Sequence, residues 1–274
     1  MIQDLEKGTF YNQYEERKAE EGDRVFCFDG DRILVRKDEE GNFFLPSAGE
    51  LGQADLQYLF RIDEERCFLL FEKKCIEGYQ WESVRLLRKR KWKELSFAAA
   101  TAYHLYRWYA DNRFCGRCSG PLHRDGRERM LNCPSCGNVV YPKIAPAVIV
   151  AVTNGDKLLL TRYNGRAYKK YALIAGFTEI GETAEETVKR EVMEEVGLKV
   201  RDIVYYKSQP WGVDSNLLLG FFCRVDGETE ITVDENELSS AGWFSREDIP
   251  EDDGFSLTGE MMGLFKKVGG NFNV

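Results

Sequence analysis

The chain has 274 residues, of which 43% are hydrophobic and 31% charged, and its formal net charge is −8 at pH 7. This balance is ordinary for a soluble globular protein, and the length is enough for one large or two modest domains. Residues 1–7 contain no apolar core flanked by basic residues, and the apolar run 145–152 is too short to span a bilayer. We therefore expect a cytoplasmic protein without a secretory signal or a membrane partner.

The charge is distributed unevenly along the chain. Residues 85–143 contain 13 Lys and Arg against 4 Asp and Glu, so this middle part carries +9 and the remainder −17. A basic middle beside an acidic remainder could attract a phosphate-rich partner. A basic helix that is simply solvated is the alternative interpretation.

Residues 1–93 are predicted to form a mainly β N-terminal domain. Two short apolar runs at 24–28 and 32–35 are joined by Asp29-Gly30-Asp31, which is typical of a hairpin turn. No catalytic constellation is evident in this part. Further elements are expected as strands at 43–45 and 67–71, a short helix at 51–60 and a basic helix at 83–93.

Residues 94–142 are predicted to form a helix followed by a zinc ribbon. The helix spans 94–110, and its shared apolar face is formed by Ala98, Ala102, Leu105, Tyr106 and Tyr109. His104 lies on or near this face, where a lone histidine is more often a packed residue than a ligand.

Two Cys-x2-Cys knuckles follow this helix, Cys115-Gly-Arg-Cys118 and Cys133-Pro-Ser-Cys136. Four thiolates with this spacing are typical of a tetrahedral Zn²⁺ site that has no open position, so the expected role is structural. Unligated cysteines or a redox pair are the alternatives. A zinc ribbon can also bind nucleic acid. The other four cysteines lie among apolar residues and are interpreted as buried small hydrophobic residues.

Residues 143–274 form the third predicted segment. Strands at 148–152 and 157–161 flank Asn154-Gly155-Asp156, another hairpin signal. The remaining elements are predicted as strands at 200–207, 217–225, 231–233 and 241–244 and a C-terminal helix at 257–268.

A helix rich in glutamate is predicted between these strands. Thr183-Ala-Glu-Glu186 has the form of a capping box, and Gly197 stands where a helix needs a residue that accepts positive φ. A buried stripe recurs every four residues between these ends and consists of Ala184, Val188, Val192 and Val196.

Three carboxylates crowd onto one side of this helix. Glu191, Glu194 and Glu195 are three and four residues apart, and like charges at that spacing cost a few tenths of a kcal/mol. A divalent cation would reverse the sign, because hard cations such as Mg²⁺ bind carboxylate oxygens together with substrate phosphates. A merely solvated Glu-rich helix is the alternative.

The stretch from Gly176 to Leu198 matches the pattern Gly-x5-Glu-x7-Arg-Glu-aliphatic-x-Glu-Glu-x-Gly-aliphatic in full. It resembles the signature of the Nudix hydrolases. The resemblance implies an α+β fold built on the Nudix α/β/α sandwich. It also implies cleavage of nucleoside diphosphates linked to another moiety, with Mg²⁺ or Mn²⁺ held on the helix.

Three features outside this pattern resemble the NADH pyrophosphatase subfamily: the four-Cys ribbon, Tyr141-Pro-Lys-Ile-Ala-Pro146, and Ser208-Gln-Pro-Trp211. The subfamily hydrolyses NAD(H) to AMP and nicotinamide mononucleotide, and some members remove NAD caps from RNA. The resemblance also implies a homodimer and a dinucleotide substrate.

After Trp211 the subfamily marker continues Pro-Phe-Pro, whereas this chain has Gly212-Val213-Asp214. Loss of the prolines loosens the loop, and loss of the Phe removes an aromatic surface. Hydrolysis of another nucleoside diphosphate derivative, such as ADP-ribose or FAD, is therefore an alternative. A nucleic-acid-binding protein with an idle Nudix domain is the third reading.

The resemblance also assigns the residues that carry the chemistry. Glu191, Glu194 and Glu195 match the metal-binding carboxylates, with Glu195 also helping to deprotonate or orient the attacking water. Glu237 matches an additional metal ligand on a loop, unless it is an ordinary exposed residue. Glu182 and Arg190 match the pair of residues that holds the motif together.

The same resemblance assigns four residues to the substrate. Tyr141 and Phe177 match the aromatic pair that sandwiches the adenine ring, with core packing as the alternative. Gln209 and Trp211 match the residues that receive the rest of the dinucleotide.

Overall fold

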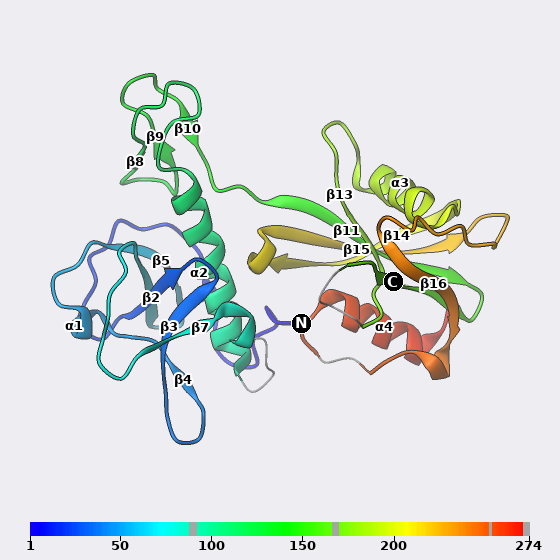
Figure 1. Cartoon of the computed structure of the whole chain (residues 1–274), viewed down its shortest axis with the longest axis horizontal. Helices are drawn as coiled ribbons and strands as arrows, with labels where there is room; N and C mark the ends of the chain where they lie inside the picture. Colours follow the sequence, from blue (N-terminus) through cyan, green and yellow to red (C-terminus); the bar gives the residue numbers. More distant parts are fainter. Residues whose placement is uncertain (88–91, 166–169, 252–253, 271–274) are drawn as a thin grey trace. The chain divides into compact units, whose positions relative to one another are not determined.

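The computed structural model describes residues 1–87, 92–165, 170–251 and 254–270 (Figure 1). The chain divides into two compact units. Asp4–Lys143 and Gly212–Ser215 form one unit, and Met1–Gln3, Ile144–Trp211 and Asn216–Val274 form the other. The predicted domain boundaries at residues 93 and 142 remain a prediction, because the two compact units have different boundaries. Within the described residues, none of the helices combines the length and apolar character needed to cross a membrane.

The unit that contains Asp4–Lys143 is built on a seven-stranded sheet with the order β1-β5-β6-β2-β3-β4, in which β7 also pairs with β3. The predicted hairpin is confirmed, since Phe28 pairs with Ile33 and Asp29 with Arg32. The strands are β1 Phe10–Tyr11, β2 Arg24–Asp29, β3 Arg32–Lys37, β4 Phe43–Phe44, β5 Leu56–Ile62, β6 Glu65–Leu70 and β7 Gln80–Ser83.

Helix α2, Lys93–Asp111, closes one core of this unit. Its Ala98, Ala99 and Ala102 are buried in one cluster with Phe26 and Phe60 of the sheet. Small side chains on the helix and aromatic ones on the strands allow close packing. The predicted helix 94–110 is confirmed. The ribbon follows as a three-stranded sheet of β8 His123–Arg124, β9 Leu131–Asn132 and β10 Val139–Val140.

Two helix predictions in this unit are wrong. Residues 51–60 are not a helix, because the apolar and aromatic run Leu56–Ile62 pairs as strand β5, and only α1, Ala48–Leu51, is helical. The basic helix expected at 83–93 is replaced by the end of β7 and the 3-10 helix η1, Val84–Leu87. Residues 88–91 of that prediction lie outside the described residues.

The second unit contains a six-stranded sheet with the order β14-β15-β11-β12-β16, and β13 also pairs with β11. Strands β11 and β15 are parallel, with Val148 opposite Leu219. The strands are β11 Ala145–Asn154, β12 Lys157–Tyr163, β13 Ile174–Phe177, β14 Val200–Trp211, β15 Asn216–Val225 and β16 Leu238–Ser245. The helices are α3 Ala184–Val196, α4 Leu257–Val268, and the 3-10 helix η4 Arg246–Asp248.

Strand β11 shows how this sheet is covered on both faces. Val148, Val150 and Val152 are buried in one cluster with the valines of α3. The intervening Ile149 and Ala151 are buried in another cluster with Met261 and Phe265 of α4 and with Met1. Because successive side chains of a strand point to opposite faces, α3 and α4 cover opposite sides of the sheet. The predicted α/β/α sandwich within an α+β protein is confirmed.

The remaining predictions for this unit hold with one exception. The strands around Asn154-Gly155-Asp156 form a hairpin, and the C-terminal helix has its predicted bounds. The strand expected at 231–233 is wrong. This segment has no ladder partner in the described sheet, and Thr232 instead donates its backbone N–H to the Val196 carbonyl at the end of α3, at 3.0 Å.

Candidate active site

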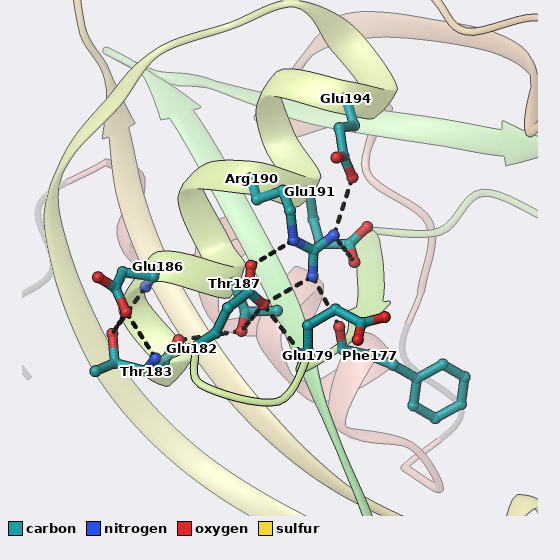
Figure 2. A network of polar contacts seen from close by, with 9 residues as sticks. All are labelled: Phe177, Glu179, Glu182, Thr183, Glu186, Thr187, Arg190, Glu191 and Glu194. Carbon is teal, nitrogen blue, oxygen red and sulfur yellow. Dashed lines mark hydrogen bonds and ion pairs between the residues drawn. The ribbon is translucent and has the colours of Figure 1, made fainter.

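Local sequence signals fix both ends of the glutamate helix α3. The Thr183 hydroxyl accepts from the Glu186 backbone N–H at 3.2 Å, and the Glu186 carboxylate accepts from the Thr183 backbone N–H at 2.8 Å. This is the predicted capping box, worth about 1 kcal/mol. Gly197 ends the helix in the left-handed region at φ 70°. The helix therefore presents its carboxylates in a fixed register (Figure 2).

Arg190 is the hub of the polar network on α3 (Figure 2). Its Nε donates to Glu182 at 2.6 Å, and its Nη2 donates to the Phe177 carbonyl at 2.9 Å. Its Nη1 donates to Glu191 at 2.8 Å and to Glu194 at 2.9 Å. One guanidinium thus binds three carboxylates and the end of β13. Charge-assisted bonds of this kind give geometric specificity as well as energy.

The environment moves the pKa values of two of these carboxyl groups in opposite directions. Hydrogen bonds from Arg190 and from the Glu179 backbone N–H lower the pKa of Glu182 to about 2. Burial raises the pKa of Glu191, partly opposed by Arg190 and reinforced by the charges of Glu194 and Glu237. Glu182 is therefore ionised at neutral pH and holds Arg190, whereas burial disfavours the charged form of Glu191.

The depressed pKa of Glu182 predicts a pH dependence of stability. The bond to Arg190 stabilises the fold fully above the ordinary glutamate pKa, and this contribution is lost as the pH falls from about 4.5 to about 2. We expect the difference in free energy of unfolding between wild type and Glu182→Gln to shrink over that range in denaturant titrations. Protonation of the ribbon cysteines at low pH destabilises both proteins equally, so it cancels when the two free energies of unfolding are subtracted. A constant difference down to the lowest pH would contradict the assignment.

Glu191 and Glu195 are buried, whereas Glu194 is exposed. Glu191 has 8% and Glu195 1% of its surface accessible, and the Glu194 side chain has 58%. The Glu191 carboxyl group lies directly on the backbone of Gly176 in β13, where an added Cβ would overlap it. The first glycine of the motif is therefore needed because its missing side chain leaves space for the Glu191 carboxyl group. The sequence pattern contains this glycine but gives no sign of the contact.

Glu237 lies in a turn just before β16, and its charge contributes to the raised pKa of Glu191. The structure therefore brings this loop residue into the electrostatic range of the α3 carboxylates. Within the described part of the chain, the carboxylates do not gather as tightly as the four cysteines, which form the one group with all potential ligand atoms within 4.8 Å of one another. Carboxylates, whether buried as in Glu191 and Glu195 or exposed as in Glu194 and Glu237, are the hard oxygen donors that suit Mg²⁺ or Mn²⁺.

The four cysteines of the ribbon come together as predicted. The Cys115 and Cys136 Sγ atoms are 3.6 Å apart, and those of Cys118 and Cys133 are 3.4 Å apart. The backbone N–H groups of Arg117 and Cys118 lower the pKa of the Cys115 thiol to about 6. Four close sulfur atoms, one of them stabilised as a thiolate, fit a structural Zn²⁺ with a closed shell.

Loss of zinc is expected to unfold the ribbon but leave the sandwich folded. The ribbon sheet consists of three two-residue strands, which cannot bury enough apolar surface to be stable without the metal. Cys133→Ala should therefore lower the hydrogen-exchange protection factors of the ribbon amides by orders of magnitude. Exchange in β11 and α3 is the internal control. Retained protection at 131–140 after zinc loss would contradict a structural role.

The two predicted adenine-binding aromatics are both exposed. Phe177 ends β13 beside the Arg190 network and has 54% of its surface accessible. Tyr141 has 56% accessible and donates its hydroxyl to Glu128 at 3.1 Å. Core packing is therefore not the role of either ring. The two residues belong to different compact units.

Gln209 and Trp211 lie near the end of β14. Gln209 is fully buried, its amide nitrogen donates to Gln3 and to the Phe255 carbonyl, and its amide oxygen accepts from the Leu257 backbone N–H. This placement differs from the predicted substrate contact, because its polar atoms serve internal bonds at the start of α4. Trp211 is half-buried and remains the predicted contact.

The segment that replaces the subfamily's Pro-Phe-Pro forms the 3-10 helix η3, Gly212–Asp214, which packs against α2. A Cβ added at Gly212 would overlap the Ala100 carbonyl of that helix. Proline cannot occupy this position in this backbone. Nε2 of His104 on α2 donates to the Lys143 carbonyl at 2.7 Å, and burial lowers the pKa of this imidazole, as expected for a packed histidine.

Comparison with known proteins supports the family resemblance that the sequence motif indicates. The NUDIX domain model matches residues 143–262, and the NADH pyrophosphatase zinc ribbon domain model matches residues 110–141. The NAD-capped RNA hydrolase NudC of Stutzerimonas stutzeri is 35% identical over 228 residues, which are 82% of this chain and 80% of that protein. The protein of the same name from Chromobacterium violaceum is 44% identical over 56% of this chain and 57% of its own length.

Among solved structures, a NUDIX hydrolase from Nitrosomonas europaea aligns with a TM-score of 0.48 at 21% identity, over 57% of this chain and 90% of that chain. The domain model and the Stutzerimonas relative show that the chain belongs to the Nudix hydrolase family, in agreement with its motif. Within that family its four-Cys ribbon groups it with the NADH pyrophosphatase subfamily. This confirms the resemblance expected from the sequence.

Proposed function

We propose that this Nudix hydrolase cleaves the diphosphate bond of NAD(H) to give AMP and nicotinamide mononucleotide, and acts on NAD-capped RNA as a second form of the same substrate. The observation that carries the proposal is the match to the Stutzerimonas protein, which extends over 82% of the chain and includes the ribbon as well as the Nudix motif. The relatives named above are NAD-capped RNA hydrolases.

The carboxylates of α3 and its neighbouring loop support a metal-dependent reaction. We assign Glu191, Glu194, Glu195 and Glu237 as the residues that would hold Mg²⁺ or Mn²⁺. When bound, such an ion neutralises the phosphoryl oxygens and lowers the pKa of a coordinated water. Arg190 keeps Glu191 and Glu194 at their positions by direct bonds of 2.8 and 2.9 Å.

Glu195 is assigned as the residue that orients the attacking water and accepts its proton. The water oxygen forms a new bond to one phosphorus, and the bond from that phosphorus to the bridging oxygen breaks. The leaving phosphate takes the electron pair. Glu195 is only 1% exposed, so its carboxylate is shielded from bulk water at the position where it would receive the proton. Phe177 offers an exposed ring for stacking on the adenine.

A second candidate is hydrolysis of another nucleoside diphosphate derivative, such as ADP-ribose or FAD. The observation that favours it is the glycine-containing segment Gly212–Asp214, which packs on α2 in place of Pro-Phe-Pro. This segment directly follows Trp211, the predicted contact for the non-adenosine part of the substrate. A changed segment at that point would alter the substrate without changing the metal chemistry.

A competition assay separates the candidates. The purified chain is given NADH, NAD⁺, FAD, ADP-ribose and NAD-capped RNA together with Mn²⁺, and initial rates are followed by liquid chromatography and mass spectrometry. The proposal expects NADH or NAD-capped RNA to be consumed first. Preferential loss of ADP-ribose or FAD would move the assignment to the second candidate. Binding of RNA without cleavage of any compound would favour the third alternative, a nucleic-acid-binding protein with an idle Nudix domain.

We also propose that the protein works as a homodimer in the cytoplasm, as the subfamily resemblance implies. Sedimentation analysis tests the dimer, with a monomer at micromolar concentration as the contrary result.

A further inference from the structure

Glu237 is carried by a turn that shapes itself through local bonds. The backbone N–H groups of Glu237 and Leu238 donate to the Asp234 carbonyl at 3.2 and 2.9 Å. The Asp234 carboxylate accepts from the Asn236 backbone at 2.9 Å and from its side chain at 2.8 Å. Short polar side chains commonly fix turns in this way.

This turn is also fastened to the rest of the sandwich on two sides. On one side, the Asp234 backbone N–H donates to the Glu195 carbonyl of α3 at 3.0 Å. On the other side stands Asn164, the first residue after β12. Its backbone N–H donates to the Glu237 carbonyl at 2.8 Å, and its side-chain Nδ2 donates to the Glu235 carbonyl at 3.0 Å.

The second attachment matters because of what the turn carries. The Glu237 side chain is exposed, so packing does not hold its carboxylate, and the backbone of the turn sets the direction in which the side chain leaves the chain. The turn nevertheless lies against α3, because the Asp234 backbone N–H donates to the Glu195 carbonyl at 3.0 Å. Asn164 therefore binds one carbonyl before the Cα of Glu237, that of Glu235, and one directly after it, that of Glu237 itself.

We propose that Asn164 is a positioning residue, whose side-chain amide fixes the Glu235 carbonyl and so aims the Glu237 carboxylate at the metal-binding face of α3. The inference rests on the proposed function, because it takes Glu237 as a metal ligand. We assign Asn164 no direct contact with the metal or the substrate. Residues that orient metal ligands typically alter metal affinity by about tenfold or more when they are removed.

The test measures Mn²⁺ binding to the full chain by electron paramagnetic resonance, without substrate. Asn164→Ala keeps the backbone bond and removes only the amide, and we expect Mn²⁺ affinity to fall about tenfold. Ser239→Ala is the matched control, since its hydroxyl donates to the Arg162 carbonyl at 3.1 Å across the same strand pair. Its Mn²⁺ affinity should equal that of the wild type.

A double-mutant cycle with Glu237→Gln distinguishes positioning from loosening of the fold. If Asn164 acts through Glu237, the double variant binds Mn²⁺ like Glu237→Gln alone. An additional loss in the double variant would overturn the inference, as would wild-type affinity in Asn164→Ala when Glu237→Gln is weakened. If Glu237→Gln binds Mn²⁺ like the wild type, Glu237 is not a ligand, and that part of the proposed function fails together with the inference.

Discussion

Glu195→Gln is expected to lower kcat by about 10³-fold, because the substitution removes both a metal-binding oxygen and the group assigned to accept the proton of water. The amide has nearly the same shape as the carboxylate, and it replaces a charge at a position that is only 1% exposed. The thermal midpoint should therefore stay the same or rise, since burying a charge is costly. Steady-state kinetics at saturating Mn²⁺ together with thermal unfolding measure both effects.

Glu185→Gln is the control for this prediction, because Glu185 is an exposed residue in the first turn of the same helix. It should change kcat little and stability by a few tenths of a kcal/mol through the helix dipole. Full activity of Glu195→Gln at saturating metal would remove Glu195 from the chemistry. Equal losses in both variants would indicate a general effect of helix charge.

Gly176→Ala is expected to reduce activity by about 10²-fold and to destabilise the sandwich by about 1–3 kcal/mol, which is typical of overpacking. The new methyl group would occupy the space of the Glu191 carboxyl group. Glu191 must then leave its bonded position beside Arg190 or push β13 away from β11, where Gly176 pairs with Val148. Kinetics and denaturant unfolding of the same preparation test the two parts.

Gly242→Ala provides a matched control in the same sheet. An added Cβ there would meet only the Phe244 ring, at an ordinary contact distance of 3.5 Å, and Gly242 has no positive φ. We expect near-normal activity and stability from this variant. Near-normal activity of Gly176→Ala itself would mean that activity does not require the contact of Glu191 with the Gly176 backbone in β13.

The sequence predicted best what local chemistry determines. The capping box at Thr183, the left-handed end at Gly197 and the hairpin at Gly155 are encoded within a few residues, and the structure confirms each. Apolar periodicity failed where tertiary pairing decides. Leu56–Ile62 has enough apolar residues for either state, and it becomes a strand because β6 offers a ladder partner.

The candidate site was predictable to the same extent. The motif placed the glutamates on one helix, because their spacing is a property of that helix. It could not show that Arg190 joins three of them, nor that Glu191 rests on Gly176, because these contacts depend on how β13 meets α3. Gln209 illustrates the limit, since its burial depends on Gln3, more than two hundred residues away in the sequence.

The products formed from NADH show whether the enzyme cleaves the diphosphate bond. The purified chain is incubated with NADH and Mn²⁺, and the products are identified by liquid chromatography and mass spectrometry. We expect the wild type to form AMP and reduced nicotinamide mononucleotide in equal amounts, and Glu195→Gln to form neither. Intact NADH, or release of nicotinamide with the diphosphate bond unbroken, would contradict it.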